Sequence, residues 1–495
     1  MGYIDVNNLS YSLDDSTRIF SELSFSLDKE RTGLVGENGV GKTTLLKILV
    51  KEISLSNGSL KIGENIAYLP QDFSLNTNKT VSEFLDEPDF KILKKFQLED
   101  VDFNRNISEL SGGEKMKIAL VKILSSNPEF IILDEPTNNL DAESKEVIYQ
   151  MIKDWKKGLL IVSHDRELLN LMDRIMELTP QGLKIYGGNF ESYQYQKEVE
   201  KEALKRQFVS AKQKKEKAEK QAKKTEEKQQ KRMKKGITDR QKIGMPKSML
   251  NLMKDTAQAT ASRLTKTHQK TVASIAKKVE EIKKQISPEN EIVIKLPKTY
   301  VPKNKMVIKA IGIDFAYGEK KILNDFNLEI YGPERLCLSG KNGSGKTTLA
   351  KLLIGQLVPQ KGEIKIGVEN VVYLDQDTTV LKGEETLLTN MVRLSGLTEG
   401  ISKEMLVRFL FRGIDVNKKI EILSGGERIR AALACLLSGN KPPQLLILDE
   451  PTNNLDMEGI EKLESALNNY EGVLLVISHD KKFLENIGIT KEIKL

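Results

Sequence analysis

The sequence contains few cysteines and no long apolar run, and each absence excludes a class of protein. Cys337 and Cys435 are its only two cysteines among 495 residues, so one chain cannot build a disulfide framework, a cysteine-ligated zinc cluster or an iron–sulfur domain. No apolar stretch approaches the ~18–20 residues needed to cross a bilayer, and the chain does not open with a basic region followed by an apolar one. With 39% apolar and 30% charged residues, we expect a soluble protein of the reducing cytoplasm.

An excess of positive charge is confined to the middle of the chain. The formal net charge is +7, yet residues 197–286 hold 27 Lys and Arg against 11 Asp and Glu. The rest of the chain therefore holds 50 basic and 59 acidic residues, a balance of −9. Because the chain is long enough for two or three domains of ~100–200 residues, the contrast predicts a basic segment that separates two domains.

A tandem repeat accounts for the regions on both sides of the basic segment. The segment 36–44 (GENGVGKTT) returns as 340–348 (GKNGSGKTT). The offset between matching landmarks grows only from 304 to 315 residues, so each copy is a complete unit. The other landmarks recur in the same order: Tyr-Leu-x-Gln at 68–71 and 373–376, Leu-Ser-Gly-Gly-Glu at 110–114 and 423–427, Leu-Asp-Glu-Pro-Thr-Asn-Asn-Leu-Asp at 133–141 and 448–456, and Ser-His-Asp at 163–165 and 478–480.

Each glycine-rich segment predicts a phosphate-binding loop. The glycines of Gly-x-x-x-x-Gly-Lys-Thr let the backbone wrap phosphate oxygens, so that successive amides and a helix N-terminus face the anion. An apolar stretch precedes each copy and a helical pattern follows it, which is the context that the motif needs. We expect Lys42 and Lys346 to contact the β- and γ-phosphates, and Thr43 and Thr347 to offer hydroxyls to Mg²⁺.

Two apolar runs end in paired carboxylates. Such runs predict buried parallel strands that deliver acids at their C-terminal ends. We expect Asp134 and Asp449 to hold Mg²⁺, while Glu135 and Glu450 orient or deprotonate the attacking water. The alternative is that these acids only cap the following helix; it is disfavoured because both pairs follow a phosphate loop at matching distances.

The Leu-Ser-Gly-Gly-Glu segments separate this chain from other proteins with phosphate loops. A solitary Ser-Gly-Gly would indicate only a helix start, with a serine cap and an acid in the first turn. Here both copies lie between a Gln and the Asp-Glu pair, and basic helix-forming residues follow them. This ordered set resembles the ATP-binding cassette (ABC) superfamily, which implies an α/β fold with two tandem ABC-type P-loop NTPase cassettes.

The resemblance implies that the cassettes of one monomer pair head to tail, each ATP lying between one phosphate loop and the other cassette's Ser-Gly-Gly helix start. Both sites then have a complete catalytic set for hydrolysing ATP to ADP and phosphate. The implied catalytic residues are Glu135, Glu450, His164, His479, Gln71 and Gln376, and the implied metal ligands are Thr43, Gln71, Asp134, Thr347, Gln376 and Asp449. The implied nucleotide contacts are Gly36, Asn38, Gly39, Gly41, Lys42, Thr43 and Thr44 with Ser424 and Gly426 in one site, and Gly340, Asn342, Gly343, Gly345, Lys346, Thr347 and Thr348 with Ser111 and Gly113 in the other.

Histidine is scarce as well, and two of the three occur in the Ser-His-Asp segments. We expect His164 and His479 to contact the γ-phosphate rather than to be surface histidines. Adjacent residues along one turn cannot form the relay of a protease triad, so that interpretation is excluded. His268 falls on an apolar seam of the middle segment, where a structural role is expected.

An aromatic residue that stacks on adenine is expected in only one cassette. Tyr317, directly before Gly318, fits the superfamily's aromatic position. The first cassette departs from the pattern, because Leu13 aligns with Tyr317 and Tyr11 is only a nearby candidate. Base stacking in the first site is therefore in doubt.

The middle segment is rich in Lys, Glu, Gln and Ala, a composition that favours long helices. From Leu250 to Ile286 its apolar residues alternate steps of three and four, as along a heptad seam, with the partner helix at about 191–235. We expect a long antiparallel α-helical hairpin that joins the two cassettes and turns around Gly236, Gly244 and Pro246. The predicted domains are cassette 1 at 1–189, the linker at 190–300 with its tip near 236–250, and cassette 2 at 301–495.

Two cassettes, Pro-Thr-Asn-Asn-Leu-Asp after each Asp-Glu and a charged hairpin together resemble the ABC-F family of translation factors. The resemblance implies binding at the tRNA exit site of the 50S ribosomal subunit, with the hairpin directed at 23S rRNA, the P-site tRNA and the peptidyl transferase centre. The long hairpin is most similar to the ribosome-protecting, antibiotic-resistance branch. Distal RNA contacts are then expected from Arg240, Lys242, Met245, Pro246, Lys247 and Met249.

Other functions fit parts of the same sequence. The basic hairpin could be a solvated coil without a partner, since charge runs often only solubilise. The chain could also energise a separate membrane exporter, act as a DNA-associated ATPase, or serve as a housekeeping ABC-F factor that rescues stalled ribosomes. Ribosome and duplex-DNA binding by a variant that lacks residues 236–250 would separate these possibilities.

Overall fold

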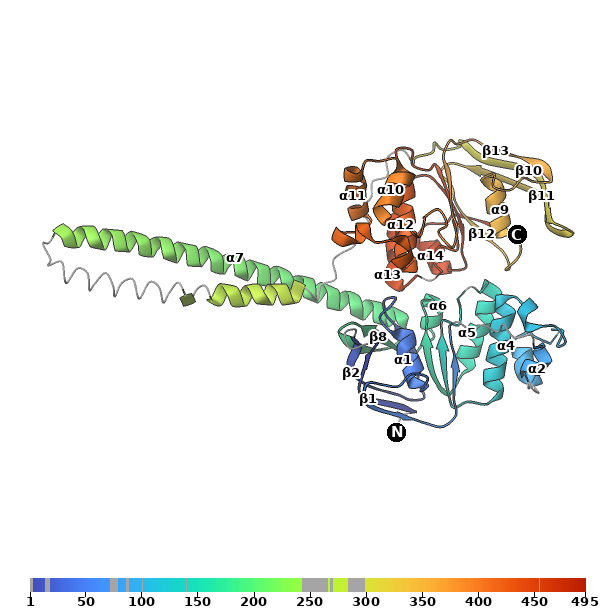
Figure 1. The fold of residues 1–495 in the computed structure, drawn as a ribbon, viewed down its shortest axis with the longest axis horizontal. Coiled ribbons are helices and arrows are strands. Elements are labelled where there is room, and N and C mark those ends of the chain that lie inside the picture. Colours follow the sequence, from blue (N-terminus) through green and yellow to red (C-terminus); the bar gives the residue numbers. More distant parts are fainter. Residues whose placement is uncertain are drawn as a thin grey trace. The chain divides into compact units, whose positions relative to one another are not determined.

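The computed structural model describes residues 3–13, 18–71, 79–85, 89–99, 101–138, 140–242, 266–267, 270–283, 299–453 and 455–495 (Figure 1). It contains two compact units, one formed by Met1–Tyr193 together with Asn290–Leu495 and the other by Gln194–Glu289. The first unit holds two α/β cassettes and the second is helical. The prediction of two cassettes with a helical region between them in the sequence is confirmed.

Cassette 1 has a mixed six-stranded sheet and a small antiparallel sheet. The large sheet has the order β5-β6-β7-β3-β8-β9, in which only β8 and β9 pair antiparallel, and the small sheet has the order β2-β1-β4. The strands are β1 (Ile4–Ser12), β2 (Arg18–Leu27), β3 (Arg31–Val35), β4 (Asn57–Ile62), β5 (Ile66–Leu69), β6 (Phe130–Asp134), β7 (Gly158–Val162), β8 (Arg174–Thr179) and β9 (Gly182–Gly187). The helices are α1 (Lys42–Leu49), α2 (Val81–Leu85), α3 (Phe90–Lys95), α4 (Gly112–Ser125), α5 (Ala142–Asp154) and α6 (Arg166–Leu169).

Cassette 2 repeats this arrangement. Its parallel sheet has the order β14-β15-β16-β12-β17, and its antiparallel sheet has the order β11-β10-β13. The strands are β10 (Met306–Tyr317), β11 (Lys320–Tyr331), β12 (Arg335–Ser339), β13 (Lys361–Ile366), β14 (Val371–Leu374), β15 (Leu445–Asp449), β16 (Val473–Ile477) and β17 (Lys491–Lys494). The helices are α9 (Lys346–Leu353), α10 (Leu387–Ser395), α11 (Glu399–Arg408), α12 (Gly425–Leu437), α13 (Met457–Asn468) and α14 (Lys481–Asn486).

The central strands of both sheets are buried along their whole length. Every residue of β6 and β7, and of β15 and β16, is buried. Continuous apolar runs are what strands covered on both faces require, whereas a half-exposed strand would alternate. The acids predicted to be catalytic therefore stand at the end of a buried strand in each cassette.

The second unit is dominated by one long helix, α7 (Phe190–Lys242), whose 53 residues correspond to about 80 Å. The helix passes through Gly236, where we expected the turn to begin, because helix-forming neighbours offset the ~1 kcal/mol cost of one glycine. Arg240 and Lys242 lie in its last turn, while Gly244, Met245, Pro246, Lys247 and Met249 lie outside the described residues, as does His268.

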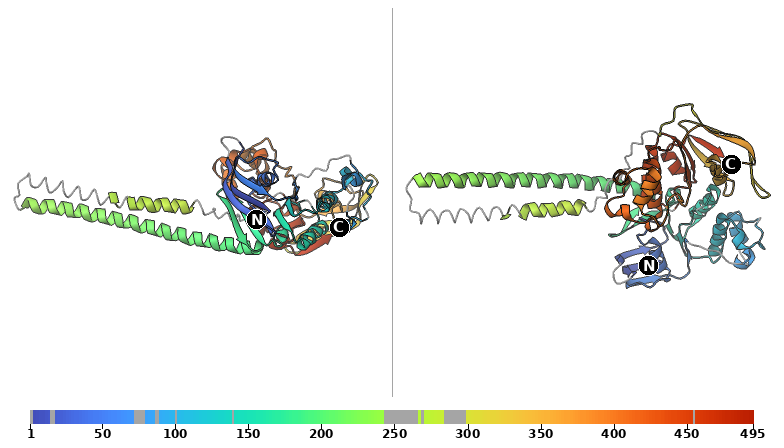
Figure 2. Two further views of the ribbon diagram at one scale, coloured as in Figure 1. Left: turned by 90° about the horizontal axis from the view of Figure 1, so that it is seen from below. Right: turned by 45° about the horizontal axis from the view of Figure 1, so that its top comes forward.

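Residues 270–283 form a second helix that lies beside α7 in Figures 1 and 2. Its less exposed positions include Val272, Ile275, Val279 and Ile282, all of which belong to the predicted seam. On α7 the less exposed positions also advance by three and four residues: Leu204, Phe208, Ala211, Lys215, Ala218, Ala222 and Thr225. Among the described residues, no helix has both the length and the apolar character needed to cross a bilayer.

Candidate nucleotide sites

The phosphate loop of each cassette connects a buried strand to a helix, β3 to α1 and β12 to α9. The residue before each helix is a glycine with a left-handed backbone, Gly41 at φ 103° and Gly345 at φ 102°. A Cβ at Gly41 would lie 2.6 Å from Ile19 Cγ2, so a side chain is excluded there. Because glycine cannot cap a helix with a side chain, the first amides of α1 and α9 remain available to an anion.

The two loop lysines are held inside their own loops. Lys42 Nζ donates to Gly36 O at 2.7 Å and to Glu37 O at 3.1 Å, and Lys346 Nζ makes the same two contacts in cassette 2 at the same distances. Burial lowers the pKa of both ammonium groups. A phosphate in the loop would supply the negative charge that compensates this desolvation.

Two oxygens that suit Mg²⁺ lie side by side at each loop. Thr43 Oγ1 donates to Asp134 Oδ2 at 2.9 Å, and Thr347 Oγ1 donates to Asp449 Oδ2 at 2.8 Å. A hydroxyl and a carboxylate at the phosphate end of the loop are the ligands that Mg²⁺ takes in P-loop enzymes. The residues therefore fit the ion, which would neutralise phosphate charge when bound. In cassette 2 the hydroxyl of Tyr373 also donates to Asp449 Oδ2, at 2.9 Å, a contact that the sequence did not suggest.

The glutamate that follows each aspartate has a left-handed backbone, with φ of 51° at Glu135 and 47° at Glu450. In a continuing strand, adjacent side chains would point to opposite faces of the sheet. The change of backbone direction removes that constraint while the Glu135 amide still donates to Val162 O at 2.9 Å. Burial raises the pKa of Glu135, and it raises the pKa of Glu450 to about 7. A carboxylate whose pKa is near neutrality suits a general base.

Each histidine lies against the glutamate of its own cassette. His164 Nε2 lies 3.3 Å from Glu135 Oε1, and His479 Nε2 lies 3.5 Å from Glu450 Oε1. Burial lowers the pKa of His164 to about 3 and that of His479 to about 4, so both imidazoles are neutral at pH 7. A neutral imidazole can donate one hydrogen bond to a phosphate oxygen without adding positive charge.

A cavity of about 360 Å³ adjoins the phosphate loop of cassette 2. Its lining includes Tyr317 and the loop, together with Gln376, Asp449 and Glu450. Tyr317 is 52% exposed and packs edge-on against Phe315, with ring centroids 5.0 Å apart. The cavity thus combines an aromatic face with the predicted phosphate and metal residues.

Cassette 1 has a different residue at the corresponding position. Tyr11 pairs with Phe20 in the small sheet, whereas Phe315 pairs with Leu323, so Tyr11 corresponds to Phe315 and Leu13 to Tyr317. Leu13 is 67% exposed. Tyr11 is therefore not the counterpart of Tyr317. Gln71 is exposed and directly follows β5 and Pro70.

The two Ser-Gly-Gly segments begin helices, as the simpler interpretation predicted. Ser111 Oγ accepts from the Glu114 amide at 3.3 Å, while Glu114 Oε2 accepts from the Ser111 amide at 2.8 Å. Ser424 and Glu427 form the same capping box at α12. Across the described residues, the contacts of these serines lie within their own helix starts, so nucleotide binding by Ser111, Gly113, Ser424 and Gly426 stays a prediction.

The contacts between the cassettes involve aspartates that the sequence did not single out as site residues. Asp456 is the N-cap of α13, and its Oδ2 accepts from the amide of Asn38 in the phosphate loop of cassette 1 at 2.9 Å. In the reciprocal contact, Asp141 Oδ2 accepts from the amide of Asn342 at 3.3 Å. Both aspartates end the repeated Pro-Thr-Asn-Asn-Leu-Asp segment, so the repeat itself was the available signal.

These sites occur in a known family. A family model described as ABC transporter matches residues 20–138 and 323–453, just over half of the chain. The chain belongs to the ABC transporter family. Both matched segments contain a phosphate loop and the Asp-Glu pair, and ABC ATP-binding domains are ATPase domains in general.

Relatives of this ABC protein extend over nearly its whole length. The ATP-binding protein Uup of Buchnera aphidicola subsp. Acyrthosiphon pisum is 32% identical over 98% of this chain and 79% of its own. The ribosome protection protein VmlR of Bacillus subtilis is 29% identical over 99% of this chain and 86% of its own. The solved structure of an RNase-L inhibitor has a TM-score of 0.63 at 20% identity, covering 97% of this chain and 86% of its own, and supports the tandem-cassette fold alone.

Hereafter, site 1 is the set formed by the phosphate loop 36–44, Asp134, Glu135 and His164, and site 2 is the set formed by the loop 340–348, Asp449, Glu450 and His479. Each site receives an aspartate from the opposite cassette, Asp456 at site 1 and Asp141 at site 2.

Proposed function

We propose that the protein is an ABC-F ATPase that hydrolyses ATP with Mg²⁺ at sites 1 and 2. In each site the loop lysine and amides hold the phosphates, and the neighbouring Thr and Asp hold the metal ion. The buried glutamate accepts a proton from the attacking water while the neutral histidine orients the γ-phosphate. The observation that carries this proposal is the repeated geometry of loop, aspartate, glutamate and histidine in both cassettes.

The proposed client is the ribosome, bound through the 50S subunit at the tRNA exit site. VmlR, named as a ribosome protection protein, aligns with 99% of this chain, and that alignment includes the helical unit between the cassettes. Residues 197–286 carry a local excess of +16, the difference between 27 basic and 11 acidic residues. A surface of that charge suits 23S rRNA and tRNA backbones, because each neutralised phosphate releases counterions.

In this scheme ATP brings the cassettes together and the closed form binds the ribosome. The helical unit, including Arg240 and Lys242, then contacts the P-site tRNA or the peptidyl transferase centre. That contact displaces a ribosome-targeting antibiotic. Hydrolysis of ATP then permits release of the protein from the ribosome. The protein works as a monomer, since both halves of each site come from one chain. It works in the cytoplasm.

Sedimentation with ribosomes tests the proposal. Glu135→Gln combined with Glu450→Gln should retain the protein on the 50S subunit with ATP but not with ADP, because both predicted bases are lost while binding residues remain. Deletion of 236–250 should weaken this retention and leave ATP hydrolysis intact. Equal release of parent and double variant in ATP would contradict the proposal.

A housekeeping role is the second candidate, because bacterial relatives that match at 30–32% identity, slightly above VmlR, are called only ATP-binding protein Uup, a name that does not mention ribosome protection. A drug-susceptibility panel of cells that express the parent chain separates the two roles. Protection against one drug class supports the resistance role, whereas rescue of stalled ribosomes without protection supports the housekeeping role. Retention by duplex DNA or by a membrane subunit would favour the remaining alternatives.

A further inference from the structure

Helix α13 of cassette 2 contacts site 1 at two points. At its start, Asp456 accepts from the Asn38 amide at 2.9 Å. Two helical turns later, Glu464 Oε1 accepts from Arg166 Nη1 at 2.8 Å. The side chains of Arg166 and Glu464 are only 8% and 11% exposed, so this ion pair is buried between the cassettes.

Arg166 directly follows the Ser-His-Asp segment of site 1 and is the first residue of α6. His164, two residues earlier, lies 3.3 Å from Glu135 Oε1. Asp165 caps the same helix by accepting from the Glu167 and Leu168 amides, each at 3.1 Å. Arg166 therefore lies in the same capped helix start that follows the histidine packed against Glu135.

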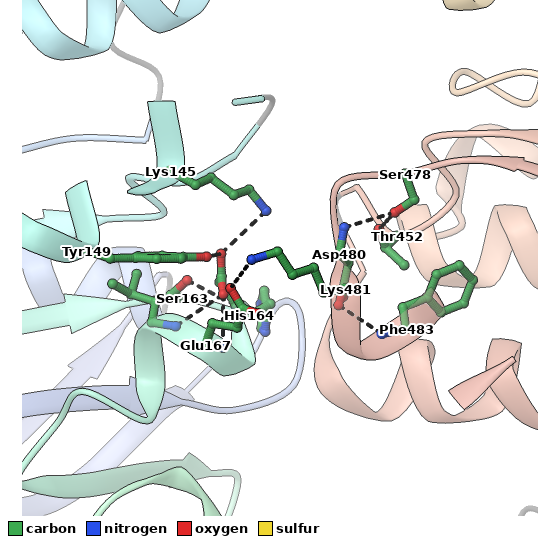
Figure 3. Close-up of polar contacts among 12 residues, drawn as sticks. Lys145, Tyr149, Ser163, His164, Glu167, Thr452, Ser478, Asp480, Lys481 and Phe483 are labelled. Atoms are coloured by element: carbon green, nitrogen blue, oxygen red, sulfur yellow. Dashed lines mark hydrogen bonds and ion pairs between the residues drawn. The ribbon is translucent and has the colours of Figure 1, made fainter. Parts of the chain in front are cut away.

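The corresponding positions at site 2 hold different residues. Tyr149 on α5 stands where Glu464 stands on α13, and Lys481 stands where Arg166 stands, since both lie at the 315-residue offset of the repeat. Tyr149 donates to Asp165 Oδ2 at 2.6 Å within its own cassette. Lys481 Nζ lies 3.8 Å from Glu167 Oε2, and the side chain of Lys481 is 64% exposed and that of Glu167 42% exposed. Figure 3 shows Tyr149 and Lys145 on one side of this cluster and Lys481 reaching toward it from the other cassette.

The two pairs differ in what their loss would cost. Removal of one member of a buried ion pair leaves an uncompensated charge out of water, which is strongly unfavourable. An exposed pair is screened by solvent and contributes little. Arg166, beside the histidine of site 1, is thus paired with α13 of the opposite cassette. At site 2 the counterpart of Glu464, Tyr149, bonds within its own cassette, and Lys481 makes only an exposed contact to Glu167.

We propose that Arg166 and Glu464 are positioning residues that make hydrolysis at site 1 depend on the approach of α13, so that the two ATP sites are unequal. This inference rests on the proposed ATPase activity. Arg166 and Glu464 do not touch the reacting atoms; they hold His164 and Glu135 in place once cassette 2 has closed. Site 2 hydrolyses ATP without a corresponding buried ion pair to the opposite cassette.

Single-site backgrounds of the full-length protein test the inference. Glu450→Gln leaves only site 1 able to hydrolyse ATP, and Glu135→Gln leaves only site 2. Adding Glu464→Gln should lower kcat about tenfold in the first background, with KM for ATP changed less than twofold, because alignment is lost and not binding. In the second background the same substitution should change kcat less than twofold.

A second variant tests whether a general loss of folding explains the lower rate. Arg166→Met combined with Glu464→Leu removes both charges, and apolar replacement of a buried pair is often neutral for stability. Its melting temperature should stay close to that of the parent while site 1 still loses its rate. The matched control, Glu167→Gln with Lys481→Gln, removes the exposed pair and should leave both sites unchanged.

Five outcomes would overturn the inference. Equal losses at both sites, or a melting temperature that collapses in the apolar double variant, would assign the pair a structural role alone. An unchanged rate at site 1 would show that the pair does not act on it. Absence of hydrolysis in the parent protein would refute the proposed ATPase activity and this inference with it, whereas hydrolysis by the parent that is lost in both backgrounds would refute this inference alone.

Discussion

Sites 1 and 2 share their phosphate loops and differ in what the opposite cassette presents to them. The loop lysine contacts have equal lengths in the two cassettes, and the Thr–Asp hydrogen bonds differ by 0.1 Å, at 2.9 and 2.8 Å. Across the interface, however, Glu464 of α13 corresponds to Tyr149 of α5, and Ile460 corresponds to Lys145. Duplication has therefore kept the local chemistry and altered the contacts between the halves.

The adenine end of the sites differs as well. Site 2 has the half-exposed ring of Tyr317, and the corresponding residue at site 1 is Leu13. Residues that wrap phosphate have little freedom, because a left-handed glycine or a metal ligand admits no substitute. Residues that face the base or the partner cassette can vary, so differences between the sites accumulate there.

The largest expected effect comes from the catalytic glutamates taken one at a time. Glu135→Gln and Glu450→Gln should each lower hydrolysis at their own site by about 100-fold or more, since each removes a general base. Single-turnover hydrolysis with equimolar ATP measures the site that remains. If the two sites are unequal, the residual rates of the two variants will differ. Identical rates would show that sites 1 and 2 hydrolyse ATP equally well.

A pH-dependent stability difference should follow from the buried Glu450. Its pKa is about 7 in the folded protein against an ordinary 4.5, so the native state retains a proton that the unfolded state releases. The free energy of unfolding therefore falls as pH rises from about 4.5 to about 7. Glu450→Gln should remove this loss and stabilise the nucleotide- and Mg²⁺-free protein by about 3 kcal/mol at pH 8, with almost no gain at pH 4.5.

Urea unfolding at the two pH values measures this effect. Glu369→Gln, at an exposed position, is the matched control and should show no pH-dependent gain. If Glu450→Gln raised the free energy of unfolding as much at pH 4.5 as at pH 8, the effect would not come from the raised pKa of the buried Glu450 carboxyl.

A smaller effect is expected at the adenine end. Tyr317→Ala should raise KM for ATP at site 2 about fivefold in the Glu135→Gln background, which corresponds to ~1 kcal/mol of stacking. Leu13→Ala should change KM at site 1 less than twofold in the Glu450→Gln background. Equal changes at the two sites would show that Leu13 and Tyr317 contribute alike to base binding.

The smallest effect concerns Lys145, which lies on α5 of cassette 1 and lines a cavity of about 230 Å³ together with Glu450 and His479. Its side chain is 16% exposed. Lys145→Met should raise KM for ATP at site 2 about threefold, because one partly screened positive charge is lost near the phosphates. Ile460→Met makes the matched change at the corresponding position and should leave KM at site 1 unchanged.

Much of the fold could be predicted from the sequence because it depends on local rules. Continuous apolar runs predicted the buried strands, and the spacing of glycine, lysine and threonine predicted the strand–loop–helix units. The capping boxes at Ser111 and Ser424 likewise follow from a serine with a glutamate three residues later. The end of α7 was placed too early, because a single glycine within helix-forming neighbours does not end a helix.

The remaining features depend on contacts between distant segments. The pairing of Arg166 with Glu464 joins residues 298 positions apart, and neither residue belongs to a recognisable motif. The hydrogen bond from Tyr373 to Asp449 required the parallel pairing of β14 and β15, which brings their C-terminal ends together. The alignment of Leu13 with Tyr317 was available from the sequence, and the strand register agrees with it, because Tyr11 occupies the position of Phe315.

Nucleotide-driven approach of the two cassettes can be measured directly by fluorescence energy transfer. Lys61→Cys and Lys365→Cys place one label on an exposed strand position of each cassette, and both native cysteines are buried. In the Glu135→Gln, Glu450→Gln background, ATP with Mg²⁺ should increase transfer efficiency, whereas ADP should leave it at the nucleotide-free value. Transfer that does not respond to ATP would contradict the claim that nucleotide brings the halves together.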